Sequence, residues 1–181
     1  ATHDSQLRDF EVRTTLNESY SQAELTVEVD LRRLVRSRAT ASLGMTLINP
    51  EGNQVLASSA STELGPCGEA RVQLAGTVDD PWLWSAEAPN LYRLMISSTD
   101  ESGEEQIFIR RIGFRDVGIV DGQLKVNGKP ILIRGVNRHE HNPDTGHYVT
   151  EEQMLTDLRL LKQHGFNAVR PGHYPLTPRW Y

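Results

Sequence analysis

The sequence contains little that would tie it to a membrane, a nucleic acid or an oxidising compartment. Cys67 is the only cysteine among the 181 residues, so no internal disulfide can form and we expect a cytoplasmic protein. No apolar run approaches the roughly 20 residues that a membrane-spanning helix needs. The formal net charge of −5 lacks the basic excess of nucleic-acid-binding proteins, so we expect neither a membrane nor a nucleic acid as a partner. The segment 1–5 also lacks the basic region and apolar core of a signal peptide.

Alternating apolar and polar residues run through the first two-thirds of the chain. This alternation indicates strands with one buried face. The apolar members of four such strands are Phe10, Val12 and Leu16; Leu25, Val27, Val29 and Leu31; Leu43, Met45 and Leu47; and Ala70, Val72 and Leu74. Turn signals separate strands at 49–53 and 100–103. About seven short strands without a long helical pattern predict an immunoglobulin-like β-sandwich domain over residues 1–117.

Three features of this domain receive structural interpretations. Trp82 and Trp84 could bind the face of a sugar, but we favour a loop whose indoles anchor one end of the sandwich. We expect a basic cluster to be a solvated turn face, since acidic residues are abundant nearby. Its members are Arg32, Arg33, Arg36 and Arg38. Residues 61–70 are interpreted as a loop without an assignable role.

The pattern changes over residues 118–181, where helical spacing appears for the first time. Asp121-Gly122 and Asn127-Gly128 are strong hairpin turn pairs, because these residue types tolerate positive φ. We then expect a strand at 131–136, a helix that begins with a capping box at Thr150 and ends at Gly165, and a strand at 166–170. Residues 178–181 have the character of the first turn of another helix.

A strand, a helix and a second strand form a βαβ unit with two parallel strands. One such unit cannot bury its own faces. We therefore predict a mainly β chain, in which the β-sandwich is followed by the first βαβ unit of a truncated (β/α)8 TIM barrel. In such barrels the active site lies at the carboxyl ends of the strands.

Titratable residues follow both predicted barrel strands. The first strand leads into Asn137, Arg138, His139, Glu140 and His141, and the second leads into Arg170, His173 and Tyr174. Neighbouring strands lie about 4.8 Å apart, so side chains from the two strand ends can share one pocket. Imidazole, guanidinium and phenol groups suit a polyhydroxylated ligand, and an arginine can hold an ionised carboxylate.

Three interpretations of His139 and His141 remain open on the residues alone. A His-x-His pair could bind a metal ion, although two histidines do not complete a site. The two side chains could make only local hydrogen bonds in a polar loop. We favour the third interpretation, which is sugar recognition, and expect no metal or other cofactor within this stretch.

Two segments, Arg134-Gly-Val-Asn-Arg-His-Glu-His-Asn-Pro143 and Phe166-Asn-Ala-Val-Arg-Pro-Gly-His-Tyr-Pro175, resemble the barrel entrance of the large β-galactosidases of glycoside hydrolase family 2. Segments 82–92, 112–115 and 124–130 look like the same family. The resemblance implies a fragment of a retaining enzyme that hydrolyses terminal non-reducing β-D-galactose residues in β-galactosides. It implies that His139 and His173 bind galactose hydroxyls and that Arg170 supports the nucleophilic carboxylate.

The resemblance also has limits. Pro171-Gly172 stands where many relatives have Cys-Ser or similar small residues. The two catalytic glutamates of the family fall outside these residues, so we expect the stretch alone to be inactive. A homo-oligomeric parent that binds Mg²⁺ and Na⁺ is implied by the family only.

Two other functions stay open from the sequence. The chain could be a non-catalytic carbohydrate-binding or structural sandwich module. It could also belong to a family relative that acts on another β-glycoside, such as a glucuronide or a mannoside.

Overall fold

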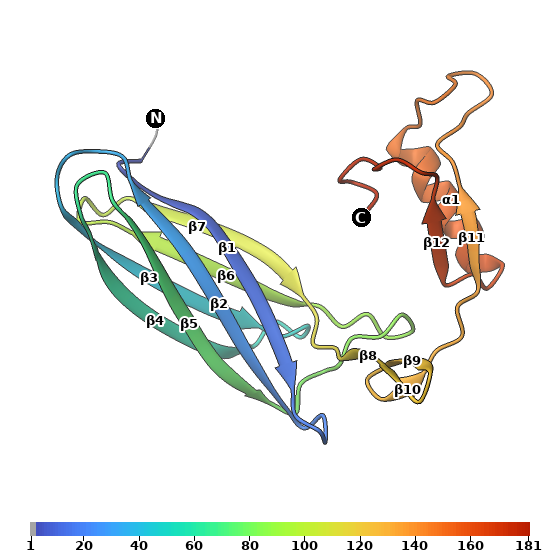
Figure 1. Ribbon diagram of the computed structural model, residues 1–181, viewed down its shortest axis with the longest axis horizontal. Helices are drawn as coiled ribbons and strands as arrows, with labels where there is room; N and C mark the ends of the chain where they lie inside the picture. Colours follow the sequence, from blue (N-terminus) through green and yellow to red (C-terminus); the bar gives the residue numbers. More distant parts are fainter. Residues whose placement is uncertain (1–2) are drawn as a thin grey trace. The chain divides into compact units, whose positions relative to one another are not determined.

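The computed structural model describes residues 3–181, which divide into two compact units between Lys129 and Pro130 (Figure 1). The first unit contains a β-sandwich followed by a small β-sheet. The second unit contains two strands and a helix. The domain boundary between residues 117 and 118 stays a prediction, since the compact units divide twelve residues later along the chain, at residue 129.

The sandwich consists of two antiparallel sheets (Figure 1). One sheet has the order β1-β2-β5, formed by β1 (Ser5–Leu16), β2 (Gln22–Arg33) and β5 (Glu69–Asp79). The other has the order β4-β3-β6-β7, formed by β4 (Gln54–Leu64), β3 (Ala39–Ile48), β6 (Tyr92–Thr99) and β7 (Glu105–Ile112). The predicted immunoglobulin-like sandwich is confirmed.

The core lies between the inner faces of these sheets. The apolar residues that alternate along β2 are at most 1% exposed, and the inward residues of β3 are at most 6% exposed. At one end of the core, Tyr92 meets Phe114 edge to face, with ring centroids 4.9 Å apart. The period of two in the sequence therefore identified the buried face correctly.

The side chain of Gln106 joins the edge strands of the two sheets by hydrogen bonds. The carboxamide oxygen of Gln106, on β7, accepts a hydrogen bond from the Leu7 backbone N–H at 3.3 Å. Its nitrogen donates to the Ser5 backbone carbonyl at 2.6 Å. The amide thus offers β1 one donor and one acceptor, which are the groups that a neighbouring strand would offer.

The structure corrects two expectations within the sandwich. Most of the segment 61–70 is strand rather than loop, because β4 continues to Leu64 and β5 starts at Glu69. Arg33 is not solvated but only 8% exposed. Its guanidinium donates to the Ser5 hydroxyl at 2.8 Å and to the Ser37 hydroxyl at 2.7 Å. These hydrogen bonds compensate for its removal from water.

The two tryptophans play different parts at their end of the sandwich. Trp84 lies beneath the guanidinium of Arg115, whose central carbon is 4.8 Å from the ring centroid. Trp82 remains 43% exposed, while its backbone N–H donates to the Tyr92 hydroxyl at 2.8 Å. Packing of the Trp84 indole agrees with the predicted anchor, and the Trp82 ring is left largely in solvent.

A small sheet with the order β10-β9-β8 follows the sandwich. It is formed by β8 (Val117–Val120), β9 (Gln123–Val126) and β10 (Lys129–Pro130). Both predicted turn pairs connect its strands. Asp121 and Gly122 have φ of 54° and 72°, and Asn127 and Gly128 have φ of 50° and 73°. These angles are the ones that hairpin turns of this kind require.

The second unit is a βαβ unit, as predicted (Figure 1). Strand β11 (Gly135–Arg138) pairs in parallel with β12 (Ala168–Pro171), and α1 (Glu151–Gln163) connects them. The helix begins with the predicted capping box, in which Thr150 and Gln153 bind each other's backbone N–H. Gly165 follows its C-cap with φ of 74°, the left-handed conformation that ends a helix. No helix within residues 3–181 is long and apolar enough to cross a membrane.

The predicted strand at 131–136 is wrong in its first half. Ile131, Leu132 and Ile133 form no strand and are 41%, 69% and 59% exposed. The side chain of Asn167 contacts this segment instead, accepting from the Arg134 N–H at 2.8 Å and donating to the Leu132 carbonyl at 2.8 Å. The side-chain amide therefore takes the place of strand-to-strand backbone hydrogen bonds in this segment. The parallel pairing begins only at Gly135.

The sandwich core predicts a large effect of shortening Leu94, which is fully buried on β6. Leu94→Ala should lower the free energy of unfolding of the sandwich by about 2–5 kcal/mol, from lost transfer energy and the cavity left behind. Urea denaturation followed by tryptophan fluorescence would measure the change. Ile109→Ala on β7, where the side chain is 51% exposed, is the control and should change stability by less than about 1 kcal/mol. Equal losses in both variants would contradict the assigned core.

Candidate functional site

The parallel pairing of β11 and β12 brings the two predicted polar strand ends together. Asn137 lies opposite Arg170, and Arg138 lies opposite Pro171. The ladder extends one step further, since the Gly172 N–H donates to the Arg138 carbonyl at 2.7 Å. His139 and His173 therefore leave adjacent strands at the same end of the sheet.

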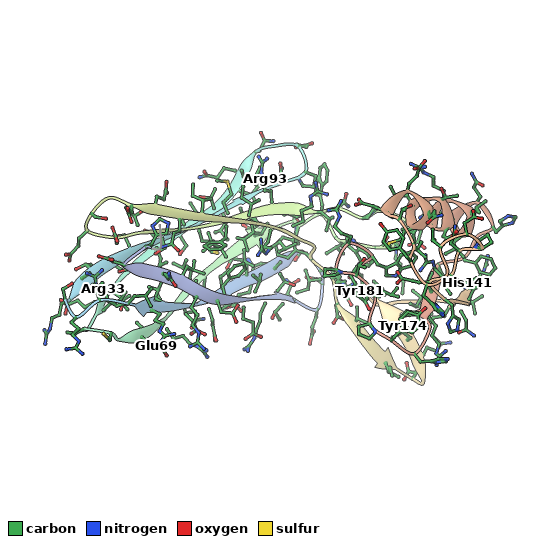
Figure 2. All side chains as sticks on the ribbon, turned by 90° about the horizontal axis from the view of Figure 1, so that it is seen from above. Arg33, Glu69, Arg93, His141, Tyr174 and Tyr181 are labelled. Atoms are coloured by element: carbon green, nitrogen blue, oxygen red, sulfur yellow. The ribbon has the colours of Figure 1, made fainter. Side chains whose placement is uncertain are left out.

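The two histidines face each other at this end. Their ring centroids are 5.3 Å apart, and the rings are tilted by 69°. Tyr174, labelled in Figure 2, lies 6.1 Å from His139 by ring centroids, and its hydroxyl accepts a hydrogen bond from the Glu140 N–H at 2.8 Å. His139, His173 and Tyr174 are all exposed side chains, so the imidazoles are accessible to a ligand. We call these three residues the histidine cluster.

Arg170 lies one step back along the strand pair from the histidine cluster. Its guanidinium donates to the Asn137 side-chain oxygen at 3.5 Å, which is a long hydrogen bond. Both residues line an open pocket of about 250 Å³ over the β11–β12 pair, whose floor includes the small residues Gly135 and Ala168. Arg170 thus has one weak protein contact and is exposed at this pocket.

His141 does not join His139, although the two are adjacent members of the His-x-His motif. Its ring lies against His147, with centroids 5.8 Å apart. His147 in turn binds the Glu140 carbonyl through Nδ1 at 2.9 Å. Within residues 3–181, no group of three or more His, Cys, Asp or Glu side chains is arranged to hold a metal ion. The two histidines of the His-x-His motif therefore make separate local contacts, His139 with His173 and His141 with His147.

Arg138 lies directly behind the histidine cluster and is 8% exposed. It donates to Asp157 of α1 at 2.8 Å, and its guanidinium stacks on Trp180 with 4.2 Å between the guanidinium carbon and the ring centroid. Glu140 lies on another side, with 3.9 Å between Arg138 Nη1 and Glu140 Oε1. That separation is too long for a hydrogen bond, and both atoms are buried without a partner. Arg138 therefore joins β11, α1 and the segment after β12.

Sequence reasoning missed this cluster around Arg138. A signal was present in the helix, where Asp157 follows Met154 by three residues and precedes Leu161 by four. That spacing puts a carboxylate on the apolar face of α1. An acidic residue at such a position indicates a buried cationic partner, which Arg138 provides.

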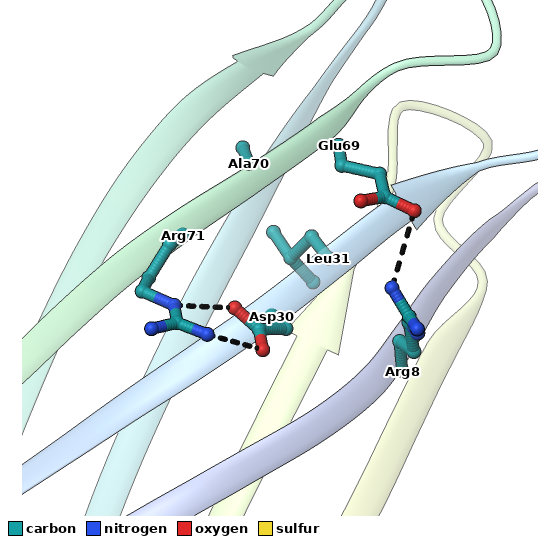
Figure 3. A pocket seen from close by; sticks show the side chains of 6 residues that line it. All are labelled: Arg8, Asp30, Leu31, Glu69, Ala70 and Arg71. Atoms are coloured by element: carbon teal, nitrogen blue, oxygen red, sulfur yellow. Dashed lines mark hydrogen bonds and ion pairs between the residues drawn. The ribbon is translucent and has the colours of Figure 1, made fainter.

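The pocket on the sandwich has a different character (Figure 3). Arg71 binds Asp30 through two hydrogen bonds of 2.6 and 2.8 Å, and Arg8 binds Glu69 at 3.3 Å. The Arg71 guanidinium lowers the pKa of the Asp30 carboxyl by hydrogen bonding and by its charge. The charged groups that line this pocket satisfy one another, so it offers a ligand no unpaired charge.

Comparison with known proteins assigns the chain to a family. Residues 5–115 match the sequence profile of the family described as Glycosyl hydrolases family 2, and residues 117–181 match that of its TIM barrel domain. The chain belongs to glycosyl hydrolase family 2. The predicted family resemblance is thereby confirmed, and the βαβ unit is the start of a family 2 barrel.

Similar family 2 proteins include β-galactosidases. The chain is 43% identical to a β-galactosidase of Vibrio cholerae over 97% of its own length and 18% of that protein. It is 58% identical to a β-galactosidase of Vibrio vulnificus over 56% of its length and 10% of that protein. Among solved structures, a β-glucuronidase of Bacteroides uniformis superposes with a TM-score of 0.83 and 26% identity, over 94% of this chain and 21% of that one. The chain therefore spans less than a fifth of the length of these β-galactosidases.

Two glutamates of the βαβ unit lie against arginines of the same unit. The Arg179 guanidinium donates to both carboxylate oxygens of Glu151 and lowers the pKa of that carboxyl. Glu151 and Glu152 also occupy the first turn of α1, where negative charge stabilises the helix. Glu140 points one oxygen into the buried cluster around Arg138.

The contacts of Arg138 predict that Arg138→Ala loosens the whole βαβ unit. Removing the guanidinium leaves Asp157 and Glu140 without their cation and Trp180 without its stacking partner. We expect a loss of about 3 kcal/mol in local stability, at the lower end of the range for a broken buried ion pair because Asp157 is partly exposed. Amide hydrogen exchange of β11, α1 and β12 should accelerate. Arg159→Ala, at an exposed position of the same helix, is the control, and similar exchange in both variants would disprove the role of Arg138.

Proposed function

We propose that the chain is part of a retaining β-galactosidase that hydrolyses terminal non-reducing β-D-galactose residues. The observation that carries the proposal is the pairing of His139 with His173 at the strand ends, in a chain 43% identical to a β-galactosidase. Two accessible imidazoles can each donate a hydrogen bond to a sugar hydroxyl. In this proposal they bind galactose and strengthen their hydrogen bonds in the transition state.

Arg170 has a supporting role in the proposed reaction. A retaining hydrolase needs one carboxyl group that protonates the leaving oxygen and a second, about 5–5.5 Å away, that attacks the anomeric carbon. We propose that Arg170 orients the attacking carboxylate by a charge-assisted hydrogen bond across the pocket that it lines. We propose on the family likeness that the attacking carboxylate and the proton donor come from further strands of the barrel. Glu151 is paired with Arg179, and one oxygen of Glu140 is buried 3.9 Å from Arg138 Nη1.

Mg²⁺ and Na⁺ are proposed for the complete family 2 protein on the family likeness, with ligands outside residues 1–181. A cytoplasmic location is supported by Cys67 being the only cysteine, and a homo-oligomeric state is proposed on the family likeness alone.

A panel of aryl glycosides tests the proposal. The protein expressed from the whole open reading frame should hydrolyse a nitrophenyl β-D-galactoside with a kcat/KM at least about tenfold above that for the β-D-glucuronide and the β-D-mannoside, a difference of about 1.4 kcal/mol. The 181-residue chain alone, shown to be folded by circular dichroism, should be inactive because it lacks the carboxylate pair. A preference for the glucuronide would replace the substrate assignment, and turnover by the chain alone would refute the proposed division of the site.

Removal of one imidazole tests the sugar contact. In the whole protein, His173→Ala should lower kcat/KM for the β-galactoside by about tenfold to a hundredfold, which corresponds to about 1–3 kcal/mol for a lost polar contact. His164→Ala is the matched control, since His164 is the exposed C-cap of α1 and its capping uses only backbone groups. An unchanged kcat/KM in His173→Ala would remove His173 from the site.

A further inference from the structure

The outward sides of the two sheets of the sandwich differ in charge. On the β1-β2-β5 sheet, opposite charges pair across the strands, as Arg71 does with Asp30 at 2.6 Å. The middle of the other sheet carries no charge on its outward side. One row across its four strands consists of Ala57, Thr46, Met95 and Ile109, and the next row ends in Ile107 beside small residues. Depletion of charge is typical of the centre of a protein interface.

This surface is centred on Ile107 and Ile109, and we call it the isoleucine face. Both isoleucines are 51% exposed on β7, and Met95 lies opposite Ile109 on β6. The outward residues of β3 and β4 have short side chains, such as Thr46 and Ala57, so a second sheet can approach closely. Removing the isoleucine side chains from water would favour association.

Charges of opposite sign lie at the two ends of the isoleucine face. The outward residues of β7 are, in order, Glu105, Ile107, Ile109 and Arg111. Arg93, labelled in Figure 2, lies opposite Arg111 at the basic end. Within residues 3–181, neither Glu105 nor Arg111 forms a salt bridge. Both side chains are exposed, so they are available to a partner.

The order of these residues is complementary to itself when the strand direction is reversed. A two-fold axis in the plane of the face and across the strands would reverse the direction of β7 in a second copy. Glu105 of each copy would then face Arg111 of the other, and Ile107 would face Ile109. A two-fold axis along the strands would instead put Glu105 against Glu105. The charges therefore favour the first arrangement.

We propose that the isoleucine face binds the same face of a second copy of this chain. The two sheets pack face to face about 10 Å apart, with two Glu105–Arg111 ion pairs at the ends of the apolar contact. The Gln106 side chain keeps its hydrogen bonds to β1, because they lie at the edge of the sheet and not on this face. This inference rests on the homo-oligomeric state proposed above and is independent of the substrate.

Charge reversal in the protein expressed from the whole open reading frame tests the proposal. Arg111→Glu puts two glutamates together at each end of the interface, and Glu105→Arg puts two arginines there. Each change should raise the Kd of the dimer at least about a hundredfold, since like charges brought together in an interface are strongly unfavourable. Sedimentation velocity over a series of protein concentrations should show half the wild-type mass. A monomeric wild-type protein, or wild-type mass in either variant, would overturn the proposal.

Mixing the two variants separates pairing between copies from damage within one copy. A dimer of one Arg111→Glu chain and one Glu105→Arg chain has a glutamate facing an arginine at both ends. An equimolar mixture should therefore recover the wild-type mass, and so should the double variant Glu105→Arg/Arg111→Glu. Circular dichroism of each variant checks that it is folded. A mixture that stays at half the wild-type mass would overturn the assigned symmetry.

A large side chain in the middle of the sheet distinguishes face-to-face packing from pairing of β7 edges. Ala57→Arg, on β4, should halve the mass, because Ala57 lies on the isoleucine face far from the β7 edge. Ala75→Arg is the matched control, since Ala75 is an exposed alanine on β5 of the other sheet, and it should keep the wild-type mass. Unchanged mass in Ala57→Arg, or equal losses in both variants, would overturn the face-to-face arrangement. These experiments measure mass, so their outcome stays distinct from that of the glycoside assays.

Discussion

The parallel hydrogen bonding between β11 and β12 is the constraint on which the candidate site depends. Its register puts Arg138 opposite Pro171, and the residues that follow the two strands are His139 and Gly172. Two segments more than thirty residues apart thereby present their imidazoles to each other. The connecting helix keeps this register, because α1 starts at a fixed point through its capping box and is joined to β11 by the Arg138–Asp157 pair. The strand pairing and the start of the helix together therefore determine the geometry of the site.

In the βαβ unit, the residues that line the pocket and the residues that contact the helix lie on opposite faces of the strands. Alternate residues of a strand point to opposite faces. Asn137 and Arg170 line the open pocket, whereas Arg138 turns away to Asp157 and Trp180. A chain that alternates in this way can place binding groups on one face while the residues between them fasten the strand to its helix.

Much of the fold could be predicted from the sequence because local rules and tertiary packing agree there. Alternation identified the buried residues of β2 and β3, and the Asp-Gly and Asn-Gly pairs have the positive φ angles that their hairpins require. The local rules failed where a partner distant in the sequence determines whether a residue is buried or forms a strand. Arg33 is buried because Ser5 and Ser37 accept its hydrogen bonds, and neither partnership is visible in a local pattern. Ile131–Ile133 has the composition of a strand, but the Asn167 amide takes the place of strand pairing.

The candidate site could likewise be predicted only in part from the sequence. Polar residues after apolar runs predicted that His139 and His173 would meet, and the strand register brings them together. Sequence patterns could not show that His141 turns to His147 instead, since the choice depends on the path of the loop 142–147.

The bridge made by Gln106 has a consequence for the behaviour of the sandwich in concentrated solution. Strand β1 is an edge strand, and the exposed backbone groups of an edge can recruit a strand from a second molecule. The carboxamide already occupies the N–H of Leu7 and the carbonyl of Ser5, so an incoming strand would first have to displace it. At this end of β1, a side chain of the same molecule therefore competes with pairing by a second molecule.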